Sequence, residues 1–388
     1  MVSHTVFKLI KVAKMKDSQL NMKEHSQAKI ELLSRYMDRF LNIMNQTSHI
    51  HDVYLYDLFC GEGIYPNGGT GSPIIFLEKI KNLHFANKVK SHPHIDFHCF
   101  FNDLDENKLK KLKTIIEDKK LHYEEMGSLK ITNEDYLDKL EDVVNNIEKL
   151  KRSEKAFVFI DPYGYKEIKA GDIKRLIYSK KSEVLLFLPT QNMFRFEKKS
   201  TPKSLVSFIT ELVPEDEWPE SETGLDFIET LLGKFRGYLG PEYFVDSFII
   251  TRSTNQYFCL FFFTSHIRGF EKMLEAKWKI DEEEGRSWKQ GIRSDLFADQ
   301  EKVAKTNKLR SALYKFLETA RTNGELYEFG LSQGFLTKHI NSILKEFQKN
   351  HEIEVKKEDG SSVRKGAFYV NYKKYKNNPT KIKVIKRS

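Results

Sequence analysis

The stretch VYLYDLFCGEG, residues 53–63, is an apolar run that ends in an acid and continues into two glycines one residue apart. It predicts a buried strand that opens into a nucleotide-binding turn, because glycine permits backbone angles closed to other residues and lets the main chain approach a ligand. A dinucleotide fingerprint would show a third glycine opening a helix, whereas this turn continues into Ile64-Tyr65-Pro66, which favours S-adenosylmethionine. The alternative is a tight loop after a core strand. The candidate cofactor-binding residues are Asp57, Phe59, Gly61 and Gly63.

Two further strand-like runs also end in acids. Residues 95–105 precede an amphipathic segment, so strand and helix alternate along the chain. We expect Asp103 to hold the ribose hydroxyls of the cofactor and Asp105 to cap the following helix. Residues 129–136 place Asp135 where it could bond adenine, although an ordinary helix start at Asp135 is equally consistent with the pattern.

A fourth apolar run, residues 156–160, leads directly into Asp161-Pro162-Tyr163. Ligands of open α/β sheets lie beyond the carboxyl ends of the strands, so Asp161 should lie beside the same pocket as Gly61. We interpret Asp161, Pro162 and Tyr163 as catalytic: the acid accepts a hydrogen bond from a substrate amine or hydroxyl, and the aromatic ring stacks on a flat acceptor. A proline-directed turn after a core strand is the alternative.

The fifth strand-like run, residues 183–188, is followed by polar and basic side chains. Asn192 and Arg195 are predicted to face the substrate. The alternative is that they bond the carbonyl groups of their own loop.

Further motifs accompany these in a fixed order: Glu24-His25 with Lys29 and Arg35-Tyr36, Gly71-Ser72-Pro73, residues 192–196, residues 257–264 and residues 273–278. Together the motifs resemble class I S-adenosylmethionine-dependent methyltransferases, and more closely the three-Cys-motif partner (TcmP) family. The resemblance covers roughly residues 24 to 280 and implies a doubly wound, Rossmann-like methyltransferase sheet that binds S-adenosylmethionine. It also implies substrate contacts from His25 and Lys29, and association with a radical-SAM-type protein that carries clustered cysteines.

Composition favours a soluble protein of the cytoplasm. The 388 residues are 40% hydrophobic, enough for a sizeable core in two or three domains. No apolar run is long enough for a membrane span, and residues 1–15 lack the apolar region of a secretion signal. Cys60, Cys99 and Cys259 are isolated, so neither a metal site nor a disulfide is expected. No proline precedes a cysteine, which argues against the thiolate chemistry of cytosine C5 methylation.

The carboxyl-terminal third predicts a winged helix. An amphipathic helix at residues 336–347 precedes a predicted hairpin between residues 353–357 and 364–370. Phosphate contacts are expected from the second helix and the wing, at Lys338, His339, Lys345, Arg364 and Lys365. Protein contact, or a merely solvated basic face, is the alternative.

Charge agrees mildly with a nucleic-acid partner. The net charge is +9, and its clearest concentration lies between residues 373 and 387, where seven residues are Lys or Arg and none is acidic. This segment should be a flexible cationic tail.

We therefore expect four parts: an N-terminal helical segment (1–50), a methyltransferase-like Rossmann domain (51–285) with a helical insertion at about 200–250 that caps the acceptor site, a winged-helix-like domain (300–372) and a basic tail (373–388). The first functional hypothesis is an S-adenosylmethionine-dependent enzyme that methylates a nitrogen of a nucleic-acid base. The second is a noncatalytic adaptor of the same fold that binds nucleic acid or a radical-SAM-type partner. A protein side chain or a small molecule stays open as acceptor.

Overall fold

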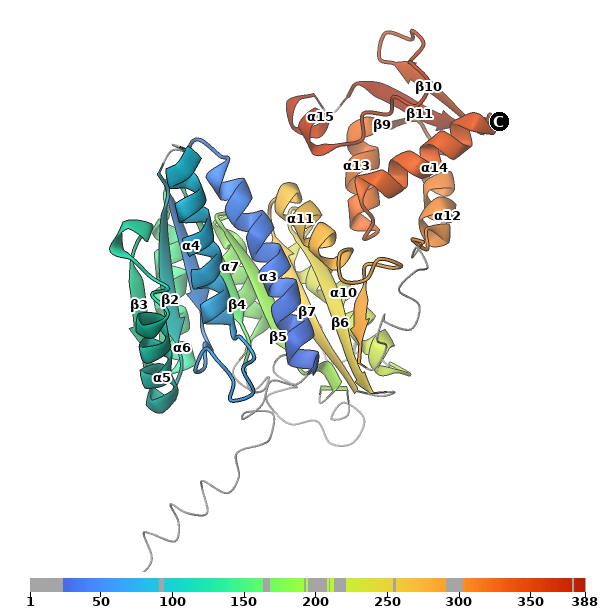
Figure 1. Cartoon of the computed structure of the whole chain (residues 1–388). Coiled ribbons are helices and arrows are strands. Elements are labelled where there is room, and N and C mark those ends of the chain that lie inside the picture. Colours follow the sequence, from blue (N-terminus) through green and yellow to red (C-terminus); the bar gives the residue numbers. More distant parts are fainter. Residues whose placement is uncertain are drawn as a thin grey trace, which may run out of the picture.

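The structure is a computed structural model (Figure 1). It describes residues 24–90, 94–162, 168–191, 193–194, 208, 210–212, 221–253, 256–290, 303–378 and 380–387.

An eight-stranded sheet of order β3-β2-β1-β4-β5-β7-β6-β8 forms the centre of the molecule. β1, β2, β3, β4 and β5 run parallel, and β7 is antiparallel to both of its neighbours. The chain reverses its strand order between β1 and β4, the kind of switch point where open α/β sheets bind ligands. The strands are Asp52–Asp57 (β1), Asp96–Asn102 (β2), Leu129–Thr132 (β3), Glu154–Ile160 (β4), Ser182–Leu188 (β5), Phe244–Ser253 (β6), Gln256–Thr264 (β7) and Ser287–Lys289 (β8).

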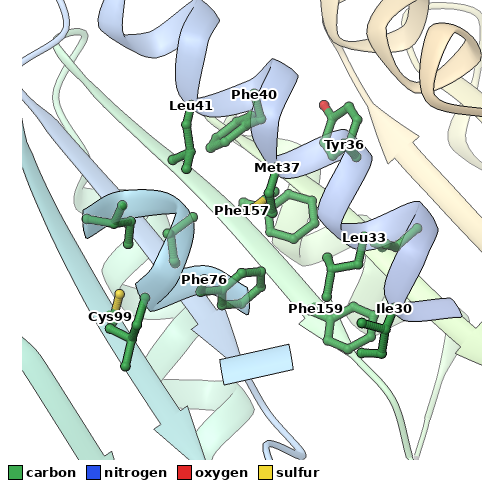
Figure 2. Close-up of a cluster of buried hydrophobic side chains, with 14 of the residues drawn as sticks. Ile30, Leu33, Tyr36, Met37, Phe40, Leu41, Phe76, Cys99, Phe157 and Phe159 are labelled. Atoms are coloured by element: carbon green, nitrogen blue, oxygen red, sulfur yellow. The ribbon is translucent and has the colours of Figure 1, made fainter. Parts of the chain in front are cut away.

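Helices cover both faces of this sheet, which confirms the predicted doubly wound α/β fold. One apolar cluster joins the sheet to α3 (Glu24–Asn45), α4 (Ser72–Lys90), α5 (Glu106–Asp118) and α11 (Ile267–Lys277). In Figure 2, side chains of α3 lie over Phe157 and Phe159 of β4. The second cluster joins the other face to α6 (Tyr136–Lys149), α7 (Ala170–Tyr178) and α10 (Gly224–Leu239). A short 3-10 helix, Glu124–Met126, precedes β3.

The insertion predicted at residues 200–250 is helical over α10, but that helix covers the sheet and β6 follows it. α10 belongs to a sheet-covering layer, with the Phe235 ring 5.3 Å from Phe261 and 5.0 Å from Phe263 between centroids. Residues 244–253 are strand β6, whose buried and half-buried residues largely alternate as in a strand. Residues 201–207, 209 and 213–220 lie outside the described part of the chain.

The carboxyl-terminal module has the element order of a winged helix, as predicted. Its three-stranded sheet has the order β10-β11-β9. The elements are α12 (Asn307–Phe316), β9 (Arg321–Thr322), α13 (Asn323–Ser332), α14 (Thr337–Lys349), β10 (Ile353–Lys357), α15 (Tyr372–Asn377) and β11 (Ile382–Lys386).

The predicted hairpin is wrong in its second strand. β10 pairs with β11 and not with residues 364–370. Ile382 and Val384 alternate with exposed residues and bury their side chains in the module, so a segment expected to be a flexible tail is a central strand. Residues 364–370 instead pack through Phe368 and Val370, both buried.

The module shares its core with α11. A single cluster contains Ile267, Phe270, Leu274 and Trp278 together with the apolar side chains of α12, α13 and α14. The Trp278 indole N–H donates to the Gly334 carbonyl at 2.9 Å. α11 follows the end of β7, where Thr264 is paired with Glu183 near the start of β5. The module therefore lies at the end of the sheet opposite the carboxyl ends of β1, β4 and β5 (Figure 1).

Candidate functional site

The loop after β1 forms the predicted glycine turn. Gly61 and Gly63 have φ of +64° and +81°, a region that only glycine adopts at low cost. A Cβ on Gly63 would lie 2.6 Å from Leu112 Cδ1, so that residue is also fixed by close packing. A Cβ on Gly61 would meet nothing within 4 Å. The turn is thus rigid on its inner side and open to a ligand at Gly61.

Asp57 ends β1 beside this turn and is fully buried. Its Oδ1 accepts the Phe59 N–H at 3.3 Å, whereas Oδ2 has no hydrogen-bond partner among the described residues. Burial raises the pKa of Asp57 from 3.8 to about 7. Hydrogen bonds from Ser72 and the Phe59 amide lower this pKa and the charges of Asp161 and Asp103 raise it. A buried oxygen without a partner is costly, and it marks the atom that a cationic or hydrogen-bonding ligand would satisfy.

Asp103 supports the turn from the end of β2. Its Oδ2 accepts the Gly61 N–H at 3.0 Å and its Oδ1 accepts the Asp105 N–H at 2.9 Å. The next side chain, Leu104, is 71% exposed, although it follows a buried strand. Asp105 caps α5 as predicted, accepting the N–H groups of Asn107 and Lys108.

Asp135 caps α6 by accepting the Leu137 N–H at 2.9 Å. Of the two alternatives drawn from the sequence, the structure therefore shows the helix start. Leu137, in the first turn of α6, is 46% exposed and is a second exposed apolar side chain near this edge of the sheet. The Phe59 ring stacks on Tyr136 with centroids 5.0 Å apart.

Asp161, directly after β4, forms an ion pair with Lys29 of α3. Lys29 is 6% exposed and its Nζ lies 4.6 Å from the centre of the Phe187 ring, while 20% of the Asp161 side chain is exposed. Burial lowers the pKa of Lys29, but the charges of Asp161, Tyr65 and Asp57 outweigh it and raise the pKa above 10.5. Lys29 therefore stays protonated and donates, and it cannot serve as a base near neutral pH.

His25 lies one helical turn before Lys29 on the same face of α3. Its ring is nearly parallel to Phe258 at 5.2 Å, and Phe258 stacks on Phe187 at 5.7 Å. The sequence predicts that His25 and Lys29 contact the substrate, but it does not predict the Lys29–Asp161 ion pair or the nearby Tyr65. The only sequence pattern that links these residues is the spacing of four between His25 and Lys29, which places both on one face of a helix.

Three predicted residues, Tyr163, Asn192 and Arg195, lie outside the described residues. Pro162 is described and buried.

The winged helix presents a basic surface on α14. Lys338 and Lys345 are exposed, as predicted, and Lys349 extends the same helical face. Arg364 and Lys365 are also exposed and lie beside this helix, because the adjoining Gly366 N–H donates to Gln348 Oε1 at 2.8 Å. We call Lys338, Lys345, Lys349, Arg364 and Lys365 the basic surface.

The predicted phosphate contact by His339 is wrong. His339 is 6% exposed, its ring lies 4.2 Å from that of Trp278, and its Nδ1 accepts the Leu336 N–H at 3.3 Å. Burial, with a smaller effect of Lys338, lowers its pKa to about 4. Because residues 339, 343 and 347 share one side of the helix, His339 faces the core with Ile343 and Phe347.

The three cysteines are buried and free. Among the described residues, no cluster of His, Cys, Asp and Glu could hold a metal ion. No helix in the described part of the chain is both long enough and apolar enough to cross a bilayer.

One family model matches the chain, a GMT-like wHTH domain, over residues 279–360. No curated protein matches. Solved structures similar to this chain include an O-methyltransferase from Bacillus cereus in complex with SAH, with 13% identity, a TM-score of 0.31, and coverage of 66% of this chain and 96% of that one. Another is the O-methyltransferase TomG from Streptomyces achromogenes in complex with SAM, with 13% identity, a TM-score of 0.33, and coverage of 67% and 96%. At such low scores, the fold assignment rests on the strand order and the helical layers instead.

Proposed function

We propose that this protein binds S-adenosylmethionine and transfers its methyl group to a nitrogen of a nucleic-acid base. The observation that carries the proposal is the buried Asp57 carboxylate, whose Oδ2 has no partner among the described residues and which adjoins the glycine turn that is open at Gly61. When bound, the cofactor supplies an activated methyl group. Its α-ammonium and sulfonium groups are cationic, so they suit a site edged by carboxylates.

Other residues at this edge fit the rest of the cofactor. Each carboxylate oxygen of Asp103 accepts one backbone N–H, from Gly61 or Asp105. Each oxygen has a second lone pair that can accept a hydrogen bond from a ribose hydroxyl. Leu104, in the loop after β2, and Leu137, in the first turn of α6, are exposed apolar side chains that could cover the faces of adenine. We infer that Asp57, Gly61 and Asp103 hold the polar parts of the cofactor, and that the two leucines hold its ring.

Asp161 is the candidate proton acceptor. It is partly exposed and sits beside Asp57, so it can accept a hydrogen bond from an acceptor amine and hold the amine in line. Lys29 remains protonated and orients this carboxylate. Covalent cysteine chemistry does not fit, because burial raises the pKa values of Cys60, Cys99 and Cys259.

The test is calorimetric binding of S-adenosylmethionine and S-adenosylhomocysteine to the native chain, Asp57→Ala and Asp52→Ala. Asp52 is the matched control, since it begins the same strand and bonds His98 at the other end. We expect Asp57→Ala to weaken binding about 10- to 100-fold, the effect of losing a charged hydrogen bond. Tritiated methyl transfer to DNA and RNA then tests the acceptor. Absence of cofactor binding by the folded native chain would refute the proposal.

A second candidate is a noncatalytic adaptor that binds nucleic acid through the basic surface. It is favoured by the position of the winged helix, at the end of the sheet opposite the carboxyl end of β4, which Asp161 follows (Figure 1). Exchange of Lys338 and Lys345 for Glu should weaken binding of a DNA duplex and reduce the slope of log K against log salt by about two, one for each lost phosphate contact. Duplex binding that depends on these lysines, in a chain that binds no cofactor, would favour the adaptor.

A further inference from the structure

Tyr369 has an unusual backbone conformation. Four described residues other than glycine have positive φ: Lys120, Lys180, His351 and Tyr369. The first three lie just past the ends of α5, α7 and α14, where a left-handed residue is the ordinary way to end a helix. Tyr369, with φ of +56°, ends no helix and is bulky, so its conformation costs free energy that a glycine would not.

The surroundings of Tyr369 hold this conformation in place. Its neighbours Phe368 and Val370 are 1% and 2% exposed, so both are anchored in the core of the module. Asn341 of α14 donates to the Val370 carbonyl at 3.2 Å, and Asn323 donates to the Tyr369 carbonyl at 3.4 Å. Because Phe368 and Val370 on either side both point into the core, Tyr369 between them points its ring outward.

The ring emerges beside the basic surface. Tyr369 is 37% exposed, and its segment runs along the flank of α14 from Gln348, which bonds Gly366, to Asn341. Lys374 Nζ lies 5.9 Å from the centre of the ring. Arg364 and Lys365 come just before Tyr369 in the same segment and are exposed. An exposed aromatic ring among cations is the arrangement with which proteins hold single-stranded nucleic acid.

We propose that Tyr369 is a base-stacking residue, and that the winged helix binds nucleic acid containing an unpaired base. This inference rests on the proposed nucleic-acid binding and specifies its ligand. The lysines of α14 contact phosphates, while the Tyr369 ring stacks on a base that is not enclosed in a duplex. A fully paired duplex offers no free base face along its length, so it would use the lysines without the tyrosine.

The experiment is fluorescence anisotropy on the full chain, with labelled single-stranded oligothymidylate and with a blunt DNA duplex of equal length. The variants are Tyr369→Gly, Tyr369→Phe, and Tyr178→Ala, whose 69%-exposed tyrosine on α7 is the matched control. Glycine adopts the positive φ without strain, so Tyr369→Gly should unfold at the same or a higher urea concentration than the native chain.

We expect Tyr369→Gly to weaken single-strand binding about 5- to 150-fold, the effect of losing one stacked base, and to change duplex binding little. Tyr369→Phe should bind like the native chain, because stacking needs the ring and not the hydroxyl. Equal single-strand affinities of Tyr369→Gly and the native chain would overturn the inference, even if exchange of Lys338 and Lys345 for Glu abolished binding. Failure of the native chain to bind either nucleic acid would instead overturn nucleic-acid binding itself.

Discussion

Asp57 destabilises the ligand-free fold, and the isosteric Asp57→Asn variant should reveal by how much. The pKa of this carboxyl rises from 3.8 to about 7 because the charged form is buried. A folded-state pKa above the unfolded value means that the native state binds more protons between these two pH values. The free energy of unfolding therefore falls as the pH rises from 3.8 to about 7, and it stays low above that range.

The size of the effect follows from the same two values. A rise from 3.8 to about 7 corresponds to about 4 kcal/mol, at about 1.4 kcal/mol for each tenfold change in proton affinity. Asparagine has nearly the same shape and carries no charge, so Asp57→Asn should be more stable than the native chain above pH 7 by up to about 4 kcal/mol. At pH 4 the native carboxyl is protonated and most of this difference should disappear.

The assay is urea unfolding followed by circular dichroism at a series of pH values from 4 to 8. Only the difference between Asp57→Asn and the native chain is interpreted, because Glu183 is also buried with a pKa raised to about 7 and contributes to both proteins. Asp52→Asn, at the half-buried start of the same strand, is the control. Parallel pH profiles for the native chain and Asp57→Asn would refute the reasoning.

The same variant separates stability from function. A ligand cation that meets Asp57 favours the ionised form, so cofactor binding to the native chain should strengthen as the pH rises through about 7. Asp57→Asn should lose both the affinity and this pH dependence. A variant that is more stable but cannot bind the cofactor indicates that the native residue serves binding at the expense of stability.

Two further substitutions test the contacts around the site and the module. Lys29→Met should lower the free energy of unfolding, measured in urea, by about 1–3 kcal/mol. The loss is smaller than for a fully enclosed ion pair because Asp161 is partly exposed. The exposed pair of Lys79 and Asp38 is the control, and Lys79→Met should lower the free energy of unfolding by at most about 1 kcal/mol. Trp278→Ala should cost about 3–5 kcal/mol and, under limited proteolysis, should expose the module to cleavage; an unchanged digestion pattern would contradict the shared core.

The architecture was predictable because its signals are local. β1, β4 and β5 are short apolar runs followed by acids or turn residues, and each is a buried strand in the structure. The caps at Asp105 and Asp135 follow from an acid placed before an amphipathic run. Such features need only a few neighbouring residues, so a single sequence is enough to find them.

The predictions that failed depended on which strands pair, on residue composition, or on contacts between distant residues. β11, Ile-Lys-Val-Ile-Lys, buries the apolar residues 382 and 384, but the basic residues around it suggested a tail. Nothing local indicates that its partner lies beyond a 24-residue connection instead of the next turn. His339 was predicted to lie on the exposed side of the helix with Lys338 and Lys345. Its spacing to Ile343 and Phe347, four and eight residues on, would have placed it in the core. The Lys29–Asp161 pair joins residues 132 positions apart, so only the packing of α3 across β4 creates it.

The shared core with α11 restricts how the two functions can be combined. Ile267, Phe270, Leu274 and Trp278 are buried together with the core of the module, so the winged helix is held against α11 and is not a loosely tethered domain. The module lies at the end of the sheet opposite the carboxyl end of β4, which Asp161 follows (Figure 1). A nucleic-acid segment held by Lys338 and Lys345 is therefore not the segment that reaches Asp161 of the same chain. Binding would concentrate the protein on a nucleic acid, and the methyl acceptor would be a distant part of that molecule or one bound to another copy of the protein.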